Sequence, residues 1–246
     1  MKSFYLTDTG KVREHNEDSV IIVKNKDDSY LMVVADGMGG HSCGEVASSI
    51  TVSYLAHRFQ NSFYNLNKEE AITFISDSVK EANMEILKYA ESHPESRGMG
   101  TTLVMAVVTN TYILIANIGD SSGLVFKKKK LYKVTYDHTL VNLLVTAGEL
   151  TKEEAKNHPR KNVLMKALGV NEDVEPDIFD CEMDIDSVML CSDGVTNMLE
   201  LSQIERVLNS DIDIEDKVVK LVQKCNNRGG IDNISIAYLI REGEEK

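Results

Sequence analysis

Short runs of apolar and β-branched residues recur along the chain and predict β-strands, which typically span about four to eight such residues between turn signals. The predicted strands cover residues 3–7, 19–23, 30–35, 102–108, 112–118, 123–126, 187–191 and 234–240. Apolar residues at helical spacing predict helices over residues 44–59, 68–90, 140–147, 202–208 and 214–225. Asn67 and Thr151 each precede a Lys-Glu-Glu sequence, which is typical of a capped helix start.

The strands are arranged as hairpin pairs rather than in strict alternation with helices. Turn residues separate the members of two pairs at 25–29 and 109–111, and four lysines at 127–130 are typical of an exposed hairpin turn. Hairpins favour antiparallel sheets with helices packed outside them. Because no linker or repeat interrupts the pattern, we expect a single α+β domain over residues 1–246.

Composition limits the possible partners. A net charge of −12 makes nucleic acid and anionic membranes poor ligands, although residues that bind cations would also produce an acidic excess. The four cysteines are scattered without a C-x-x-C pair, which suits a reducing cytosol better than a zinc site or a disulfide framework. The chain shows no apolar leader and no run near the roughly 20 residues that cross a bilayer. We therefore expect a cytoplasmic protein that binds neither nucleic acid nor membrane.

Five aspartates stand at the ends of predicted strands. They are Asp18, Asp36, Asp120, Asp193 and Asp232. Antiparallel pairing of 19–23 with 30–35 brings the first two to one end of a sheet. The same pairing of 187–191 with 234–240 unites the last two, and the strand before Asp120 also ends there. We therefore expect one carboxylate cluster, with Glu17 beside it.

A cluster of carboxylates needs protons or cations, because like charges held close together repel. Oxygen ligands favour Mg²⁺ or Mn²⁺, or alternatively Ca²⁺, over zinc. Two such metals bridged by a carboxylate and a water would form a hydrolytic centre. An Asp-Gly pair after a strand is more often only a turn, which is the simpler interpretation of Asp36-Gly37 and of Asp193-Gly194. Convergence of several such pairs on one sheet end favours the metal site.

The glycine-rich stretch VVADGMGGHSCGEVAS at 33–48 has the order of a phosphate-binding loop, strand then glycines then helix. Gly39 and Gly44 have Walker A spacing, but Glu-Val follows where Lys-Ser or Lys-Thr is needed. A dinucleotide pattern starting at Gly37 places Ser42 at its last glycine position. Both nucleotide interpretations fail, and Asp36 becomes the important residue of this stretch.

Eight short motifs occur in a fixed order along the chain. They are TDTGKVREHNEDS at 7–19, the stretch at 33–48, GMGTTL at 98–103, NIGDS at 117–121, DHTLV at 137–141, NHPRKNVLMKALG at 157–169, LCSDG at 190–194 and GGIDNIS at 229–235. Together they resemble the type 2C family of metal-dependent protein serine/threonine phosphatases, particularly its compact bacterial members. The resemblance implies a four-layer αββα sandwich of two antiparallel sheets between helices, and a flap at about 137–166 beside the catalytic cleft.

The resemblance also implies metal-binding roles. Asp36 matches a carboxylate that bridges two metals, and Gly37 matches a backbone carbonyl ligand of one of them. Asp193 and Asp232 match ligands of the other metal, and Asp120 with Asp193 matches a third-metal position. Glu17 and Asp18 match outer-sphere groups that hold metal-bound water. The implied cofactor is Mn²⁺ or Mg²⁺, two or three per chain.

The implied reaction is hydrolysis of phosphoserine and phosphothreonine by attack of a metal-bridging hydroxide. Arg13 matches the arginine that grips the substrate phosphate, and a planar guanidinium suits that task. His41 is a candidate acid for the leaving oxygen, as is metal-bound water, although a structural role in the glycine loop is favoured for this histidine. At His138 a helix-capping role is expected, and at Cys191 that of a buried thiol. Ser122 stands where the family usually has arginine, which puts the contacts of that arginine in doubt.

The resemblance further implies a monomeric enzyme that acts on phosphorylated proteins and opposes a bacterial eukaryotic-like serine/threonine kinase. Two alternatives remain open from the sequence. One is a non-enzymatic regulator that binds phosphoproteins, and the other is a hydrolase of small phosphate esters. The flap is expected to influence the choice of substrate.

Overall fold

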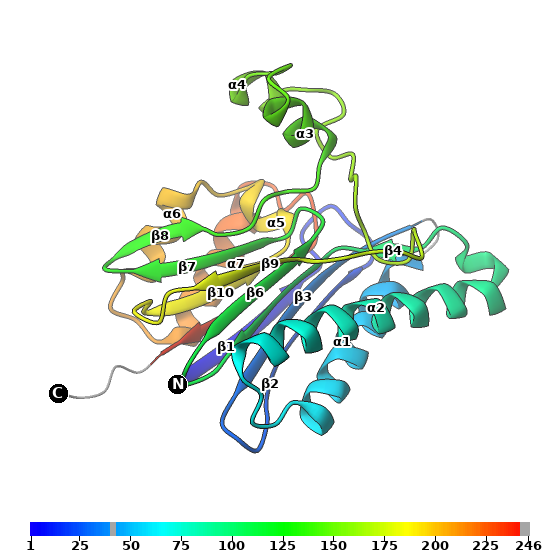
Figure 1. Ribbon diagram of the computed structural model, residues 1–246. Helices are drawn as coiled ribbons and strands as arrows, with labels where there is room; N and C mark the ends of the chain where they lie inside the picture. The colour runs from blue at the N-terminus through cyan, green and yellow to red at the C-terminus, as the bar shows by residue number, and fades with distance from the viewer. Residues whose placement is uncertain (40–42, 242–246) are drawn as a thin grey trace.

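Two antiparallel β-sheets stack face to face with helices on their outer faces in the computed structural model, which describes residues 1–39 and 43–241 (Figure 1). One sheet has the order β1-β11-β10-β7-β8, and the other has β2-β3-β5-β6-β9 with the short β4 paired to β3. The strands are β1 (Lys2–Asp8), β2 (Asp18–Lys24), β3 (Tyr30–Met38), β4 (Gly100–Thr101), β5 (Leu103–Val108), β6 (Ile113–Ile118), β7 (Ser122–Lys127), β8 (Lys130–Lys133), β9 (Asp177–Cys181), β10 (Ser187–Cys191) and β11 (Ile234–Ile240). The predicted α+β sandwich is confirmed.

The helices lie in three groups. They are α1 (Cys43–Ser62), α2 (Lys68–Ser92), α3 (Leu140–Thr146), α4 (Lys152–Lys156), α5 (Asp193–Thr196), α6 (Leu201–Leu208) and α7 (Ile214–Asn227), with a 3₁₀ turn η1 (Pro94–Ser96). Helices α1 and α2 cover one sheet, α5 to α7 cover the other, and α3 with α4 stands clear of both sheets (Figure 1). No helix in residues 1–39 and 43–241 combines the length and the apolar character needed to cross a membrane.

The middle strands of the second sheet are buried on both faces. In β3, Leu31, Val33 and Ala35 belong to the core beneath α1 and α2. Met32 and Val34, between them, belong to the core that separates the two sheets. Side chains alternate across a strand, so a strand between two cores has apolar residues at every position. This explains why the strand is an unbroken apolar run in the sequence.

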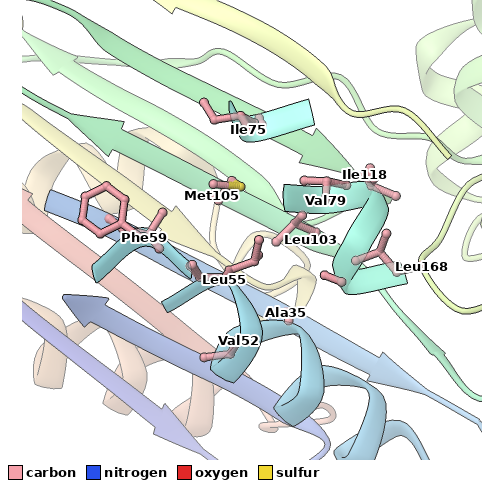
Figure 2. Packing of buried hydrophobic residues seen from close by; sticks show 14 of the residues in the cluster. Ala35, Val52, Leu55, Phe59, Ile75, Val79, Leu103, Met105, Ile118 and Leu168 are labelled. Carbon is pink, nitrogen blue, oxygen red and sulfur yellow. The ribbon is translucent and has the colours of Figure 1, made fainter. Parts of the chain in front are cut away.

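Helices α1 and α2 attach to this sheet through apolar side chains. Leu55 and Phe59 of α1 and Ile75 and Val79 of α2 lie in the same buried cluster as Met105 of β5 (Figure 2). The starts of α2 and α4, which the Lys-Glu-Glu sequences predicted, are capped as expected. Asn67 and Thr151 each form a capping box with a glutamate three residues later.

Two hairpin turns confirm the predicted pairing. Asn25 donates its backbone N–H to the carbonyl of Ser29 at 3.0 Å and closes the β2–β3 turn. In the β7–β8 hairpin Lys127 pairs with Lys130, and the two lysines between them have φ of +49° and +66°. A two-residue loop with positive φ matches the twist of the strands it joins. The lysine run is therefore a hairpin turn.

Strand β9 was not predicted. It pairs with β6 at the edge of the second sheet, and its sequence DIFDC contains two aspartates in five residues. Charged residues are common on edge strands, where they discourage pairing with other chains, and they weaken the apolar signal of the strand. The two-residue β4 and the four-residue α5 were also missed, because elements this short have no detectable periodicity.

Asn83 of α2 anchors the chain where it returns from the flap. Its buried amide donates to the carbonyls of Asn171 at 2.8 Å and Glu172 at 3.2 Å, and its Oδ1 accepts from the Gly169 N–H at 2.7 Å. Removing the amide leaves three backbone groups of the returning chain without the hydrogen bonds that Asn83 makes to them. We expect Asn83→Ala to lower the free energy of unfolding by about 2–3 kcal/mol in urea titrations. The neighbouring exposed Met84→Ala should change it little, and equal losses in both variants would contradict this role.

Candidate active site

Strand register brings the first two aspartates together. Asp18, the first residue of β2, lies opposite Asp36 of β3, as the hairpin pattern predicts. Asp18 is buried, and its Oδ2 accepts a 2.7 Å hydrogen bond from the hydroxyl of Ser192. Because Ser192 follows the last strand residue of β10, this bond joins the ends of the two sheets.

The second predicted pair lies at the same end. Strands β10 and β11 are antiparallel, with Cys191 opposite Ile236, so that Asp193 and Asp232 lie just beyond the paired residues. Asp193 begins α5 and accepts a 2.9 Å hydrogen bond from the side chain of Asn197.

A cleft of about 410 Å³ opens where these strand ends meet. Its acidic and basic lining consists of Arg13, Glu17, Asp36, Asp120, Asp193, Asp232 and Lys166, and the backbone of Gly37 borders it. Asp18 does not line the cleft but lies beneath it. The structure thus brings six of the predicted acidic and glycine residues to one cavity, and the seventh, Asp18, is buried opposite Asp36.

Two threonines of the GMGTTL motif hold the backbone of Asp36. The hydroxyl of Thr101 donates to the Asp36 carbonyl at 2.9 Å, and the Thr102 N–H donates to the same oxygen at 2.9 Å. The hydroxyl of Thr102 accepts from the Asp36 N–H at 3.0 Å. These bonds fix the strand end from which the carboxylate projects, a function that the sequence did not reveal.

The glycines after Asp36 and Asp193 are required by close packing. A Cβ atom at Gly37 would lie 2.2 Å from the carbonyl oxygen of Gly44, and one at Gly194 would lie 1.9 Å from that of Asn233. Gly37 lies inside β3 and Gly194 inside α5, so neither forms the turn that an Asp-Gly pair usually indicates. The simple turn interpretation of both pairs is wrong.

The carboxyl groups at the cleft strongly disfavour one another's ionisation. Burial, and then the neighbouring charges of Asp18 and Asp193, raise the pKa of Asp36 well above its usual value. Burial followed by the charge of Asp193 raises the pKa of Asp120 to about 7. Burial and the charge of Asp232 raise the pKa of Asp193 to about 6. The site therefore favours protons or cations over bare carboxylates.

Glu17 and Asp18 share this environment. Burial raises the pKa of Glu17, and burial also raises the pKa of Asp18 to about 7, although the hydroxyls of Ser192 and Ser235 offset part of the shift. The Oδ1 atom of Asp18 is buried and has no hydrogen-bond partner within residues 1–39 and 43–241. An enclosed carboxylate oxygen without a donor is an acceptor available to a water or a cation.

Arg13 brings positive charge to the mouth of the cleft. Its guanidinium lies 2.9 Å from the Oδ2 atom of Asp232, and its side chain is about half exposed. The hydrogen bond to Asp232 raises the pKa of Arg13. The arginine is thus held at the acidic site by an ion pair and still faces solvent, where a dianionic ligand would arrive.

Comparison with known proteins decides the family. Residues 10–229 match the family model described as protein phosphatase 2C. The chain belongs to the protein phosphatase 2C family. Members of this family are metal-dependent, and homologues of this chain are named protein serine/threonine phosphatases. This phosphatase is therefore an enzyme that acts on phosphorylated proteins, and the non-enzymatic alternative is not supported.

Bacterial relatives match the phosphatase over nearly its full length. Serine/threonine phosphatase stp of Listeria monocytogenes serovar 1/2a is 41% identical over 247 residues, covering 100% of this chain and 98% of its own. Protein phosphatase PhpP of Streptococcus pneumoniae is 35% identical, with 100% and 99% covered. The crystal structure of Stp1 from Staphylococcus aureus has a TM-score of 0.93 at 35% identity, with 98% and 95% covered. That of PstP/Ppp from Mycobacterium tuberculosis has a TM-score of 0.88 at 30% identity, with 98% and 99% covered.

The residues at the cleft fit a divalent cation in their chemistry. Within residues 1–39 and 43–241, no three His, Cys, Asp or Glu side chains are grouped closely enough to hold an ion as they stand. The cleft does supply carboxylate oxygens with raised pKa values, and in the described part of the chain Asp18 Oδ1 has no hydrogen-bond partner. Hard cations such as Mg²⁺ and Mn²⁺ take such oxygen ligands.

Three further predictions have different outcomes. His41 lies outside the described residues. Cys191 is fully buried, and burial raises the pKa of its thiol to about 12, which confirms a core thiol rather than a nucleophile. Ser122 is buried in β7 opposite Cys191 and does not line the cleft, and its hydroxyl has no hydrogen-bond partner among the described residues.

Asn233 organises the cleft from below and was not identified from the sequence. Its Oδ1 accepts the Glu17 N–H at 2.9 Å, and its amide donates to the carbonyls of Thr9 and His15 at 3.0 Å each. It thereby ties the β11 end to the loop that carries Arg13. An asparagine beside an aspartate is a common turn residue, so no local signal distinguishes this role.

His138 does not cap α3, contrary to the prediction, because Thr139 is the capping residue. The His138 ring instead joins the flap to two neighbouring segments. Its Nδ1 accepts the Gly119 N–H at 3.1 Å, so Nε2 carries the proton that is donated to Asp177 at 3.0 Å. Lys166, at the other end of the flap, also contacts Asp177, at 3.3 Å. Both ends of the flap thus contact β9, and the end at His138 also contacts the turn before Asp120.

We expect His138→Ala to loosen the flap. The loss leaves the Gly119 N–H without its acceptor and should lower the free energy of unfolding by about 1–3 kcal/mol. Trypsin should then cleave the native protein faster at the lysines and arginine of the flap, measured by mass spectrometry. His57→Ala, at an exposed position of α1, is the matched control. Unchanged cleavage in His138→Ala would show that the ring does not hold the flap.

Proposed function

We propose that the cleft binds two divalent cations, Mn²⁺ or Mg²⁺, and uses them to hydrolyse phosphoserine and phosphothreonine. In this proposal Asp36 would contribute to holding both cations, Gly37 would contribute its carbonyl to one, and Asp193 and Asp232 would hold the other. The supporting observation is that enclosed carboxyls with raised pKa values converge at one sheet end, which would be unfavourable without a compensating cation.

The remaining acidic residues have supporting roles in the proposal. Glu17 and Asp18 would accept hydrogen bonds from water in the outer shell of the bound cations. Asp120, which faces the same cleft, serves together with Asp193 at a third cation.

The chemistry follows from these positions. When bound, the cations lower the pKa of water and so supply a strong nucleophile near pH 7. Arg13 binds two phosphate oxygens through its planar guanidinium and aligns the ester for in-line attack. The leaving serine or threonine oxygen must receive a proton, for which His41 or water is the candidate donor.

We further propose the setting in which the enzyme works. It acts as a monomer in the cytoplasm and reverses phosphorylation by a bacterial eukaryotic-like serine/threonine kinase. Residues 1–246 form one catalytic domain, with a flap at about 137–166. The full-length match to bacterial phosphatases supports this reading.

The decisive experiment is hydrolysis of a phosphothreonine peptide by the purified chain. We expect phosphate release with Mn²⁺, loss of activity in EDTA, and recovery when Mn²⁺ is returned in excess. Nucleotides and sugar phosphates serve as comparison substrates and should be hydrolysed less efficiently. Full activity in EDTA would contradict the metal mechanism, and preferential hydrolysis of small esters would contradict the protein substrate.

A further inference from the structure

An apolar groove of about 330 Å³ lies at the base of the flap. Its large apolar side chains come from the segment before α3, from α3 itself and from the segment by which the flap returns to the sheets. They are Tyr136, Leu143 and Met165, which are 68%, 55% and 52% exposed. Three large apolar side chains exposed around one groove are an unfavourable arrangement in water unless something binds there.

The polar groups that line this groove are already engaged within the fold. Lys166 contacts Asp177, as does the His138 ring. The amide of Asn142 donates to the Asp137 carbonyl at 2.8 Å, and the Thr146 hydroxyl donates to the Asn142 carbonyl at 2.9 Å. The groove therefore offers an incoming group mainly aromatic and aliphatic surface.

The groove adjoins the catalytic cleft. Met165 and Lys166 line both cavities, so they form the ridge between them. On the cleft side of the ridge, the wall continues as Leu164, Ala167 and the half-exposed Val170. The residues proposed to serve the phosphate, among them Arg13 and Asp36, line the cleft and not the groove.

We propose that this groove binds an apolar side chain of the phosphoprotein substrate that lies close in sequence to the phosphorylated residue. The proposal rests on the proposed function, because it requires a phosphorylated polypeptide in the cleft. The chain that carries the phosphate continues on both sides of it, and one side crosses the ridge at Met165. The groove then recognises a leucine-like or aromatic residue, which adds sequence preference to a reaction centre that recognises only phosphate.

The test is a leucine scan through a phosphothreonine peptide made otherwise of serine, glycine and lysine. Leucine is placed in turn at each of the four positions before and after phosphothreonine, and kcat/KM is measured with Mn²⁺. We expect an increase of about 5- to 30-fold at one or two adjacent positions, which equals about 1–2 kcal/mol, the value of burying much of a leucine side chain. The gain should lie mainly in KM, because the groove holds the substrate before and during reaction alike.

Leu143→Ser is the diagnostic variant, because Leu143 lines the groove and not the cleft. Leu143→Ser should remove the dependence of kcat/KM on leucine position while leaving hydrolysis of p-nitrophenyl phosphate unchanged. Leu143→Met should restore that dependence. Met84→Ser, at a comparably exposed apolar site on α2, should behave like the wild type. A flat scan in the wild type, or a preference that survives in Leu143→Ser, would overturn the proposal.

Two other outcomes are distinguishable. If no phosphopeptide is hydrolysed with Mn²⁺, the proposed function itself is wrong. If phosphopeptides are hydrolysed but kcat/KM does not depend on the position of leucine, only the proposed role of the groove is wrong. If the wild type is a dimer in gel filtration and Leu143→Ser is a monomer, a second copy of the chain covers the groove and the proposal is wrong.

Discussion

Asp36→Asn is expected to lower kcat for a phosphothreonine peptide by at least about 10³-fold, which corresponds to about 4 kcal/mol of lost transition-state stabilisation. The asparagine keeps the size of the side chain but removes the charge that the proposed bridging position needs. Its backbone remains held by Thr101 and Thr102, so the strand end should keep its place.

The same substitution should have the opposite effect on the stability of the metal-free protein. Asp36 lies among Asp18, Asp193, Asp120 and Asp232, whose charges all raise its pKa. Removing its carboxylate relieves that repulsion, and we expect the melting temperature in EDTA to rise. A variant that loses activity by unfolding would instead melt earlier, so the two measurements together separate a missing ligand from a damaged fold.

A matched control is Asp211→Asn, which removes one negative charge from an exposed position between α6 and α7. It should leave both activity and melting temperature near the wild-type values. If Asp36→Asn retains more than about a tenth of wild-type kcat, the bridging assignment is wrong.

The sequence predicted those features that depend on short-range patterns. The apolar run of β3 and the turn at 25–29 determine that Asp18 lies opposite Asp36, because strand pairing follows once the turn is placed. The order of the motifs likewise predicted the fold and the cleft lining. A strand between two cores is visible as an unbroken apolar run, and a hairpin turn is visible as a cluster of turn residues. Both can be recognised from the local sequence alone.

Features that depend on distant contacts could not be predicted in this way. Gly37 is needed because Gly44 packs against it, and Gly194 because Asn233 does. The role of His138 depends on Gly119 and Asp177, which are 19 and 39 residues away from it in the sequence. In each case the local sequence favoured a commoner role, a turn or a helix cap, and tertiary packing imposed another.

The metal-stripped protein should become less stable as pH rises, which is the reverse of the usual behaviour of paired carboxylates. The pKa values of Asp18 and Asp120 are raised from their usual 3.8 to about 7, and that of Asp193 is raised to about 6. Between pH 4 and pH 7 the folded chain therefore binds more protons than the unfolded chain. Stability from these groups is fully present below about pH 4 and is lost as pH rises through their folded pKa values.

The expected size of this effect is large. One carboxyl raised by about three pKa units represents on the order of 4 kcal/mol. The three groups interact, so their sum should be smaller than three independent contributions. We expect the melting temperature in EDTA to fall from pH 5 to pH 8, measured by circular dichroism, and Asp120→Asn to reduce the slope.

Cations should reverse this dependence, because they replace the protons that the folded site binds. With saturating Mn²⁺ the melting temperature should hold or rise between pH 5 and pH 8, and the stabilisation by Mn²⁺ should grow with pH. The pH dependence of the melting temperature in EDTA and that in Mn²⁺ have the same cause, the carboxylates that converge at the strand ends. If the EDTA-treated protein instead gains stability over this range, these carboxyls are ionised without a partner and the argument for a cation site loses its basis.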